Sequence, residues 1–137
     1  MGEVSAEITL KNGADIVRFN DGNIKEQDIR SLTITALVDT GAMTLVMGEA
    51  LRKKLGLAVV NTRTVTLVGG SKAFCTVAEP VQIIWKDRTS LIRPWVMPDE
   101  EEVLLGVIPL EEMDLIVDPV NQTLIGAHGE EMMGRIK

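Results

Sequence analysis

Short apolar blocks, most of them alternating with polar residues, recur along the whole chain. Residues 31–38 (Ser-Leu-Thr-Ile-Thr-Ala-Leu-Val) alternate and then end in an apolar run, which predicts a strand with one buried face. Similar blocks predict further strands at residues 4–10, 44–46, 62–68, 72–77, 81–85 and 91–97. The pattern therefore indicates a mainly β fold.

Turn residues separate these blocks. Lys11-Asn12-Gly13 is typical of a tight hairpin turn, so we expect residues 16–19 to return as a strand and residues 20–23 to form a second turn. This hairpin would make residues 1–30 an N-terminal extension, in which residues 24–30 are too charged to assign. Two more connections are expected, a hairpin turn at residues 69–71 and an acidic surface loop at residues 98–102.

One segment has the pattern of a short helix. Residues 48–55 place apolar side chains on one side and Arg52-Lys53-Lys54 on the other, and Gly56 follows as a stop signal. A weak internal echo predicts a second helix. The segment after Leu104-Leu105-Gly106 reaches Met113 and Leu115 at the same offsets at which the segment after Val46-Met47-Gly48 reaches Leu55 and Leu57. We therefore expect one or two short helices.

Composition narrows the class of protein. The chain of 137 residues has the size of one domain with a real core, so residues 1–137 are expected to form a single domain. The net charge of −6 argues against a nucleic-acid partner. No run reaches the roughly 18 apolar residues that cross a membrane, and the first residues lack a secretory signal pattern. We expect a cytoplasmic protein with no membrane partner.

The single cysteine and the single histidine offer little chemistry. Cys75 cannot form an internal disulfide, and this fits a reducing compartment. His128 lies in a polar, glycine-flanked segment, so a nucleophilic pair with Cys75 is not favoured. Neither residue has zinc-ligand spacing with another Cys or His, and we expect no metal site.

A carboxylate at the end of a strand is the most informative chemical feature. Asp39-Thr40-Gly41-Ala42 directly follows the strand predicted at residues 31–38. By itself the triplet also fits an ordinary turn, because Asp and Gly are common turn residues. Far downstream comes Leu104-Leu105-Gly106. The two signatures, in this order and at this separation, resemble the retropepsin-like aspartic proteases over about residues 33–125 of this chain.

The resemblance assigns roles to these residues. Asp39 would be the catalytic carboxylate, paired with Asp39 of a second chain because the sequence holds one triplet. Such a pair holds a water, with one carboxylate acting as base while the other donates a proton to the scissile carbonyl. Thr40 would bond across the two-fold axis, and Gly41 would permit an unusual backbone and bring its amide to the carboxylate. Leu104 and Leu105 would pack beneath Asp39, with Gly106 allowing close approach.

Two further segments gain an interpretation from the same resemblance. The hairpin around Gly69 and Gly70 lies where the family places a mobile flap over the cleft, although an ordinary hairpin remains an alternative. Residues 115–119 and 123–125 would pair, as in bacterial relatives. Asp118 also follows an apolar strand, but Pro119 replaces the Thr and no glycine comes next, so we expect a structural turn there. Residues 127–137 are expected to form a loose tail.

The sequence thus predicts an all-β, retropepsin-like half-barrel that acts as a homodimer. The expected activity is hydrolysis of peptide or protein substrates in extended form, with apolar side chains near the cut and no cofactor. Two alternatives stay open. The chain could be a catalytically idle dimerisation or peptide-binding module, or a small β-barrel with an accidental triplet.

Overall fold

The computed structural model describes residues 3–130. Its helices are α1 (Gly13–Asn20), α2 (Glu49–Leu55) and α3 (Val107–Glu112), with a short 3-10 helix, η1 (Glu26–Asp28). The mainly β architecture with few short helices confirms the predicted fold class. The strands in this part of the chain are β1 (Val4–Asn12), β2 (Ser31–Val38), β3 (Leu45–Met47), β4 (Val59–Thr66), β5 (Lys72–Ala78), β6 (Val81–Trp85), β7 (Arg88–Ile92), β8 (Trp95–Val96), β9 (Val103–Leu105), β10 (Leu115–Asp118) and β11 (Thr123–Gly126).

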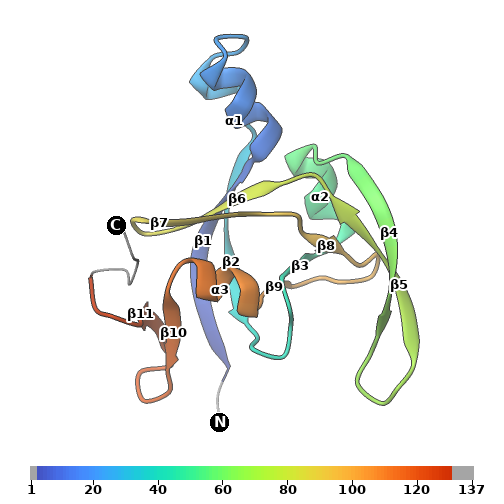
Figure 1. The fold of residues 1–137 in the computed structure, drawn as a ribbon, viewed down its shortest axis with the longest axis vertical. Coiled ribbons are helices and arrows are strands. Elements are labelled where there is room, and N and C mark those ends of the chain that lie inside the picture. Colours follow the sequence, from blue (N-terminus) through green and yellow to red (C-terminus); the bar gives the residue numbers. More distant parts are fainter. Residues whose placement is uncertain (1–2, 131–137) are drawn as a thin grey trace, which may run out of the picture.

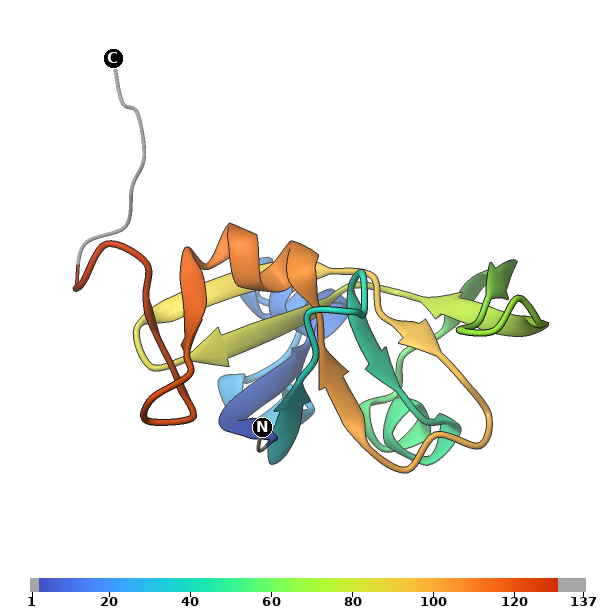
Figure 2. The ribbon, with the colours of Figure 1, turned by 90° about the horizontal axis from the view of Figure 1, so that it is seen from below.

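Nine of these strands form one sheet, in the order β4-β5-β8-β3-β9-β2-β1-β6-β7 (Figure 1). Strand β2 runs parallel to β9 and β3 runs parallel to β8, whereas the other neighbours are antiparallel. Strands β10 and β11 form a separate antiparallel pair, as predicted. At one edge, the β4–β5 hairpin extends away from the rest of the molecule (Figure 2).

The N-terminal segment is an internal part of this sheet. Strand β1 lies between β2 and β6, and its ladder with β2 runs from Val4 opposite Val38 to Lys11 opposite Ser31. Its alternate side chains Ala6, Ile8 and Leu10 are buried, as expected for a strand with one core face. Strand β1 therefore pairs directly with the strand that leads to Asp39.

The predicted hairpin at Lys11-Asn12-Gly13 is wrong, because helix α1 follows β1 directly. The Asn12 side chain accepts a hydrogen bond from the Asp15 amide at 3.0 Å and so caps the helix. Gly13 lies against the Pro80 carbonyl, where a Cβ would come within 2.6 Å of the oxygen. The Asn-Gly pair therefore begins a helix instead of a turn. The strand expected at residues 16–19 is wrong as well, because these residues belong to α1, and the second predicted turn covers residues 21–24 instead of 20–23.

Two strand boundaries also differ from the predictions. Residues 91–97 do not form one strand, because β7 ends at Ile92 and β8 begins at Trp95. Pro94 lies between them, and proline cannot donate to a strand ladder. Strand β4 covers Val59–Thr66 instead of residues 62–68. The strand at residues 31–38 and the helix ended by Gly56, whose φ is 67°, are confirmed.

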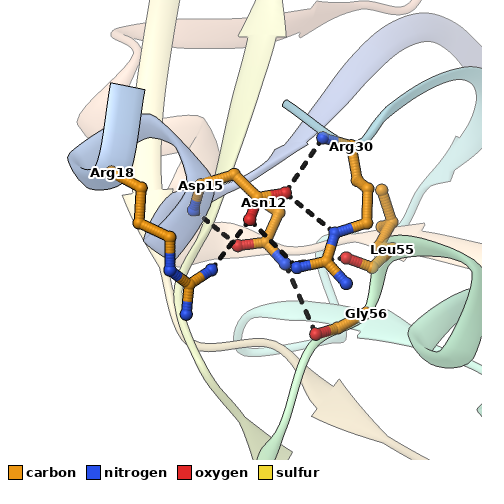
Figure 3. A network of polar contacts seen from close by, with 6 residues as sticks. All are labelled: Asn12, Asp15, Arg18, Arg30, Leu55 and Gly56. Carbon is orange, nitrogen blue, oxygen red and sulfur yellow. Dashed lines mark hydrogen bonds and ion pairs between the residues drawn. The ribbon is translucent and has the colours of Figure 1, made fainter. Parts of the chain in front are cut away.

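A polar network centred on the buried residues Asn12 and Asp15 joins α1 to α2 (Figure 3). The Asp15 carboxylate accepts two bonds from the Arg30 guanidinium, at 2.8 and 2.9 Å, and a third from the Arg30 amide. Asn12 Nδ2 donates to the Leu55 carbonyl at 2.8 Å, at the end of α2. The hydrogen bonds from Arg30 lower the pKa of Asp15 from 3.8 to about 2, although burial acts in the opposite direction.

This shift predicts an acid-dependent contribution to stability. Because the folded-state pKa lies below the ordinary value, the contribution is complete above about pH 4 and is lost as the pH falls toward about 2. Asp15→Asn should lower the free energy of unfolding by about 2 kcal/mol at neutral pH, and its difference from the wild type should shrink in acid. Urea unfolding measured along a pH series tests this. Asp21→Asn, at the exposed end of α1, should change stability by less than about 0.5 kcal/mol. A difference for Asp15→Asn that is independent of pH would contradict the role of its charge.

Candidate active site

Asp39 lies at the point where β2 leaves the sheet. Its backbone amide donates to the Leu105 carbonyl at 3.0 Å, which extends the parallel β2–β9 ladder by one residue. Its half-buried side chain accepts a hydrogen bond from the Gly41 amide, at 2.9 Å from Oδ1, and its carbonyl accepts from the Ala42 amide at 3.0 Å. The carboxylate is thus oriented by backbone groups of its own loop.

Backbone hydrogen bonds from the junction between β9 and α3 hold the rest of this loop. The amides of Gly106, Val107 and Ile108 donate to the carbonyls of Thr44, Ala42 and Met43, respectively, at 3.1, 2.9 and 2.9 Å. Three consecutive amides at a helix start would otherwise lack intrahelical partners. They therefore anchor the active-site loop, which we define as residues 39–44.

Gly106 is where the two segments approach most closely. A Cβ at this residue would lie less than 3.0 Å from the carbonyl oxygens of both Ala42 and Thr44, closer than real side chains allow. Its φ of −95° is accessible to any residue, so sterics and not conformation require glycine. Beside it, Leu105 is fully buried and Leu104 is half-buried.

The predicted internal echo corresponds to a structural repeat. Strands β3 and β9 are antiparallel neighbours, and each runs through a glycine cap into a helix, Gly48 into α2 and Gly106 into α3. Like Gly106, Gly48 abuts a backbone carbonyl, that of Glu100. Two apolar residues follow each glycine at the same offsets, and all four are buried, namely Leu55, Leu57, Met113 and Leu115.

The other residues of the triplet lie on the surface. Thr40 is exposed, and within residues 3–130 its hydroxyl forms no hydrogen bond. Gly41 is exposed as well, but its φ is not positive, so the expected unusual backbone at Gly41 is wrong. A Cβ there would lie 3.1 Å from Asp39 Oδ1. Gly41 is therefore favoured by the close approach of its own amide to the carboxylate.

The β4–β5 hairpin presents a glycine-rich and apolar tip. Gly69 and Gly70 have φ values of 97° and 91°, which favour glycine. The Leu67 amide donates to the Ser71 carbonyl at 2.7 Å and closes the turn. Val68 and Phe74 are largely exposed. The hairpin is present as predicted.

A pocket of about 590 Å³ opens beside the carboxylate. Asp39 and Thr40 form part of its wall, and Val117, Pro119 and Gln122 from the β10–β11 hairpin form another part. No sequence signal placed the β10–β11 hairpin beside Asp39, because it is brought there by packing between segments far apart in the sequence, such as β11 against β1. The pocket leaves the catalytic candidate accessible to a substrate or to a second chain.

Asp118 organises a turn, as expected. Its carboxylate accepts hydrogen bonds from the amides of Val120 and Asn121 at 3.0 and 3.3 Å, and from the Asn121 side chain at 2.8 Å. The bond from the Asn121 side chain is the main cause of the lowered pKa of Asp118. These three donors satisfy the carboxylate within its own loop.

Cys75 and His128 lie in different elements, Cys75 on β5 and His128 in the turn after β11. Cys75 is 1% exposed on β5, and burial raises the pKa of its thiol, which disfavours the reactive thiolate. His128 Nδ1 lies 2.8 Å from an Asp114 carboxylate oxygen.

The first residues of the predicted tail, 127–130, form a turn in which Arg88 donates to the Gly129 carbonyl at 2.6 Å. The expected looseness of residues 131–137 falls outside the described residues.

Metal and membrane features complete the description. Within residues 3–130, no cluster of three or more His, Cys, Asp or Glu side chains has an arrangement that could hold a metal ion. In the same part of the chain, every helix is too short or too polar to cross a membrane.

Comparison with known proteins agrees with this geometry. A search of curated proteins finds no match. A family model described as aspartyl protease matches residues 17–107, a range that contains the active-site loop, the β4–β5 hairpin and Leu104-Leu105-Gly106. The match covers more than half of the chain, and we conclude that this chain belongs to the retropepsin-like aspartyl protease family.

Proposed function

We propose that this protein is an aspartic endopeptidase whose active site forms between two copies of the chain. The observation that carries the proposal is the single carboxylate of Asp39, oriented by the Gly41 amide and by Leu105. One such carboxylate per chain supplies half of an acid–base pair. The exposed Thr40 hydroxyl, which forms no hydrogen bond within residues 3–130, supports a partner across a two-fold axis.

The two carboxylates share one proton and hold a water between them. The charged carboxylate takes a proton from the water, and the water oxygen adds to the scissile carbonyl carbon. The protonated carboxylate donates to the carbonyl oxygen, so negative charge does not build up there. The carboxylate that took the proton from the water then gives it to the amide nitrogen, and the C–N bond breaks. As the carbonyl of the new acid forms, a hydroxyl of the intermediate returns a proton to the other carboxylate, so the pair regains its starting state. No metal or cofactor takes part in this proposed sequence.

The β4–β5 hairpin supplies a cover for the substrate. As a flap, it closes over an extended peptide and excludes water during the reaction. The positive φ values of Gly69 and Gly70 permit the tip to rearrange. The backbone of the peptide forms most of the contacts. We place this activity in the cytoplasm, where the unpaired thiol of Cys75 is stable.

Mixing wild-type protein with Asp39→Asn tests the two-chain site. If subunits exchange freely, an equal mixture contains about one quarter wild-type dimers, so its activity should be about one quarter of that of the same total amount of wild-type protein. A site complete within one chain would give about one half instead.

Dilution provides an independent readout. Specific activity should fall as the protein is diluted below the dissociation constant of the dimer, and analytical ultracentrifugation should detect monomers over the same range. A fully active monomer would contradict the proposal. Specific binding of peptides without any cleavage would favour the idle binding module.

A further inference from the structure

A second pocket lies at the far end of the active-site loop, beneath the base of the flap. Its volume is about 350 Å³, and its wall includes Met43, Arg63, Arg93, Trp95 and Ile108. We call it the basic pocket. Met43 and Ile108 are 58% and 44% exposed, so the pocket combines accessible apolar side chains with two guanidinium groups.

The chain places this pocket close to the catalytic candidate. Met43 lies four residues after Asp39 in the same loop. The distance between their Cα atoms is therefore at most about 14 Å. The Ile108 amide donates to the Met43 carbonyl at 2.9 Å, so the loop and α3 form one rigid wall. Arg63 comes from β4 of the flap, opposite Cys75 in the β4–β5 ladder. An extended peptide rises about 3.3 Å per residue, so a side chain two to four residues from the cut reaches the pocket.

The charge of the pocket contrasts with that of the protein. The chain has 20 acidic against 14 basic residues, yet the pocket wall contains two arginines and no carboxylate. The side chains of the other arginines among residues 3–130 already have partners within the chain. Arg18, Arg30 and Arg52 pair with carboxylates, and Arg88 binds three carbonyls. The Arg63 and Arg93 side chains form no ion pair or hydrogen bond within the described residues.

We propose that the basic pocket makes this peptidase select substrates with an acidic side chain, glutamate best, two to four residues from the cut bond. The inference rests on the proposed function and adds a substrate class to it. The glutamate carboxylate accepts charge-assisted hydrogen bonds from Arg63 and Arg93. Its methylene groups pack on Met43 and Ile108, and aspartate is too short to make both sets of contacts. Successive side chains of an extended peptide point to opposite sides, so the preference is confined to alternate positions.

The test uses paired peptides with an apolar pair at the cut and either Glu or Gln at each flanking position in turn. At the selected position, wild-type kcat/KM should be about fivefold higher for Glu than for Gln, the size expected for solvent-exposed charge pairs. The double variant Arg63→Gln/Arg93→Gln should bring this ratio close to one. Lys53→Gln removes a positive charge from the exposed face of α2 and should leave the ratio unchanged.

A binding measurement separates failure of the pocket from failure of the peptidase. The same peptides, labelled for fluorescence anisotropy, are titrated with Asp39→Asn protein, with and without the two arginine substitutions. Cleavage with no arginine-dependent Glu preference overturns the pocket and leaves the peptidase intact. Arginine-dependent binding without cleavage by the wild type supports acidic-peptide recognition and overturns the peptidase. Equal binding of Glu and Gln peptides without cleavage overturns both.

Discussion

Asp39→Asn should lower peptidase activity by about 10³-fold or more, at the upper part of what removal of an acid–base group costs. The amide has nearly the shape of the carboxylate, and it can still accept the hydrogen bond that the Gly41 amide donates to Oδ1. It cannot take a proton from water. Activity on a peptide substrate and thermal unfolding of the same preparation are the two measurements required.

Asp118→Asn is the matched control, because Asp118 also ends a strand and lies in a turn. We expect its activity to stay within about twofold of the wild type, since its carboxylate binds only groups of its own turn. Wild-type rates for Asp39→Asn would refute the protease mechanism. A large loss for Asp118→Asn with the fold intact would point to a different pair of carboxylates.

Gly106→Ala should lower the free energy of unfolding by about 3 kcal/mol, at the upper end of the usual cost of overpacking. The new Cβ would meet two backbone carbonyls, those of Ala42 and Thr44, and neither can move without disturbing the active-site loop. The folded fraction should also lose about 100-fold in kcat/KM, because a displacement of the loop misplaces Asp39.

Val107→Ala is the control for Gly106→Ala, because it changes the adjacent, half-buried side chain and preserves every backbone bond. It should cost about 1 kcal/mol or less and keep near-normal activity. Chemical unfolding gives the stability, and rates are compared per folded molecule. Full activity of folded Gly106→Ala would show that the loop does not depend on this contact.

The sequence pattern predicted an element well where the residues that form it and those that end it are neighbours in the sequence. The alternation of residues 31–38 identified β2, and the αL stop at Gly56 ended α2 at the expected residue. It failed at Asn12-Gly13, where two local signals compete. The pair favours a hairpin turn, but Asn12 followed by Asp15 is also a helix-start pattern, and burial of Asn12 against the end of α2 favours the helix.

The loop of residues 39–44 could be recognised as a candidate site because Asp39, Thr40 and Gly41 lie together in the sequence. Its support was predictable only through the resemblance of Leu104-Leu105-Gly106. The basic pocket was not predicted, because Arg63 and Arg93 are thirty positions apart. They come together through the β4–β5 and β5–β8 pairings, and no periodicity encodes such pairings.

The anchoring of the loop by the β9–α3 junction has a consequence for the order of synthesis. Asp39 leaves the ribosome more than sixty residues before Gly106, Val107 and Ile108, whose amides hold the loop. At about 5–20 residues per second, this interval lasts roughly 3 to 13 seconds. During it, the carbonyls of Ala42, Met43 and Thr44 lack their native partners. The loop that carries the carboxylate therefore lacks its native support until all nine strands of the main sheet have been synthesised.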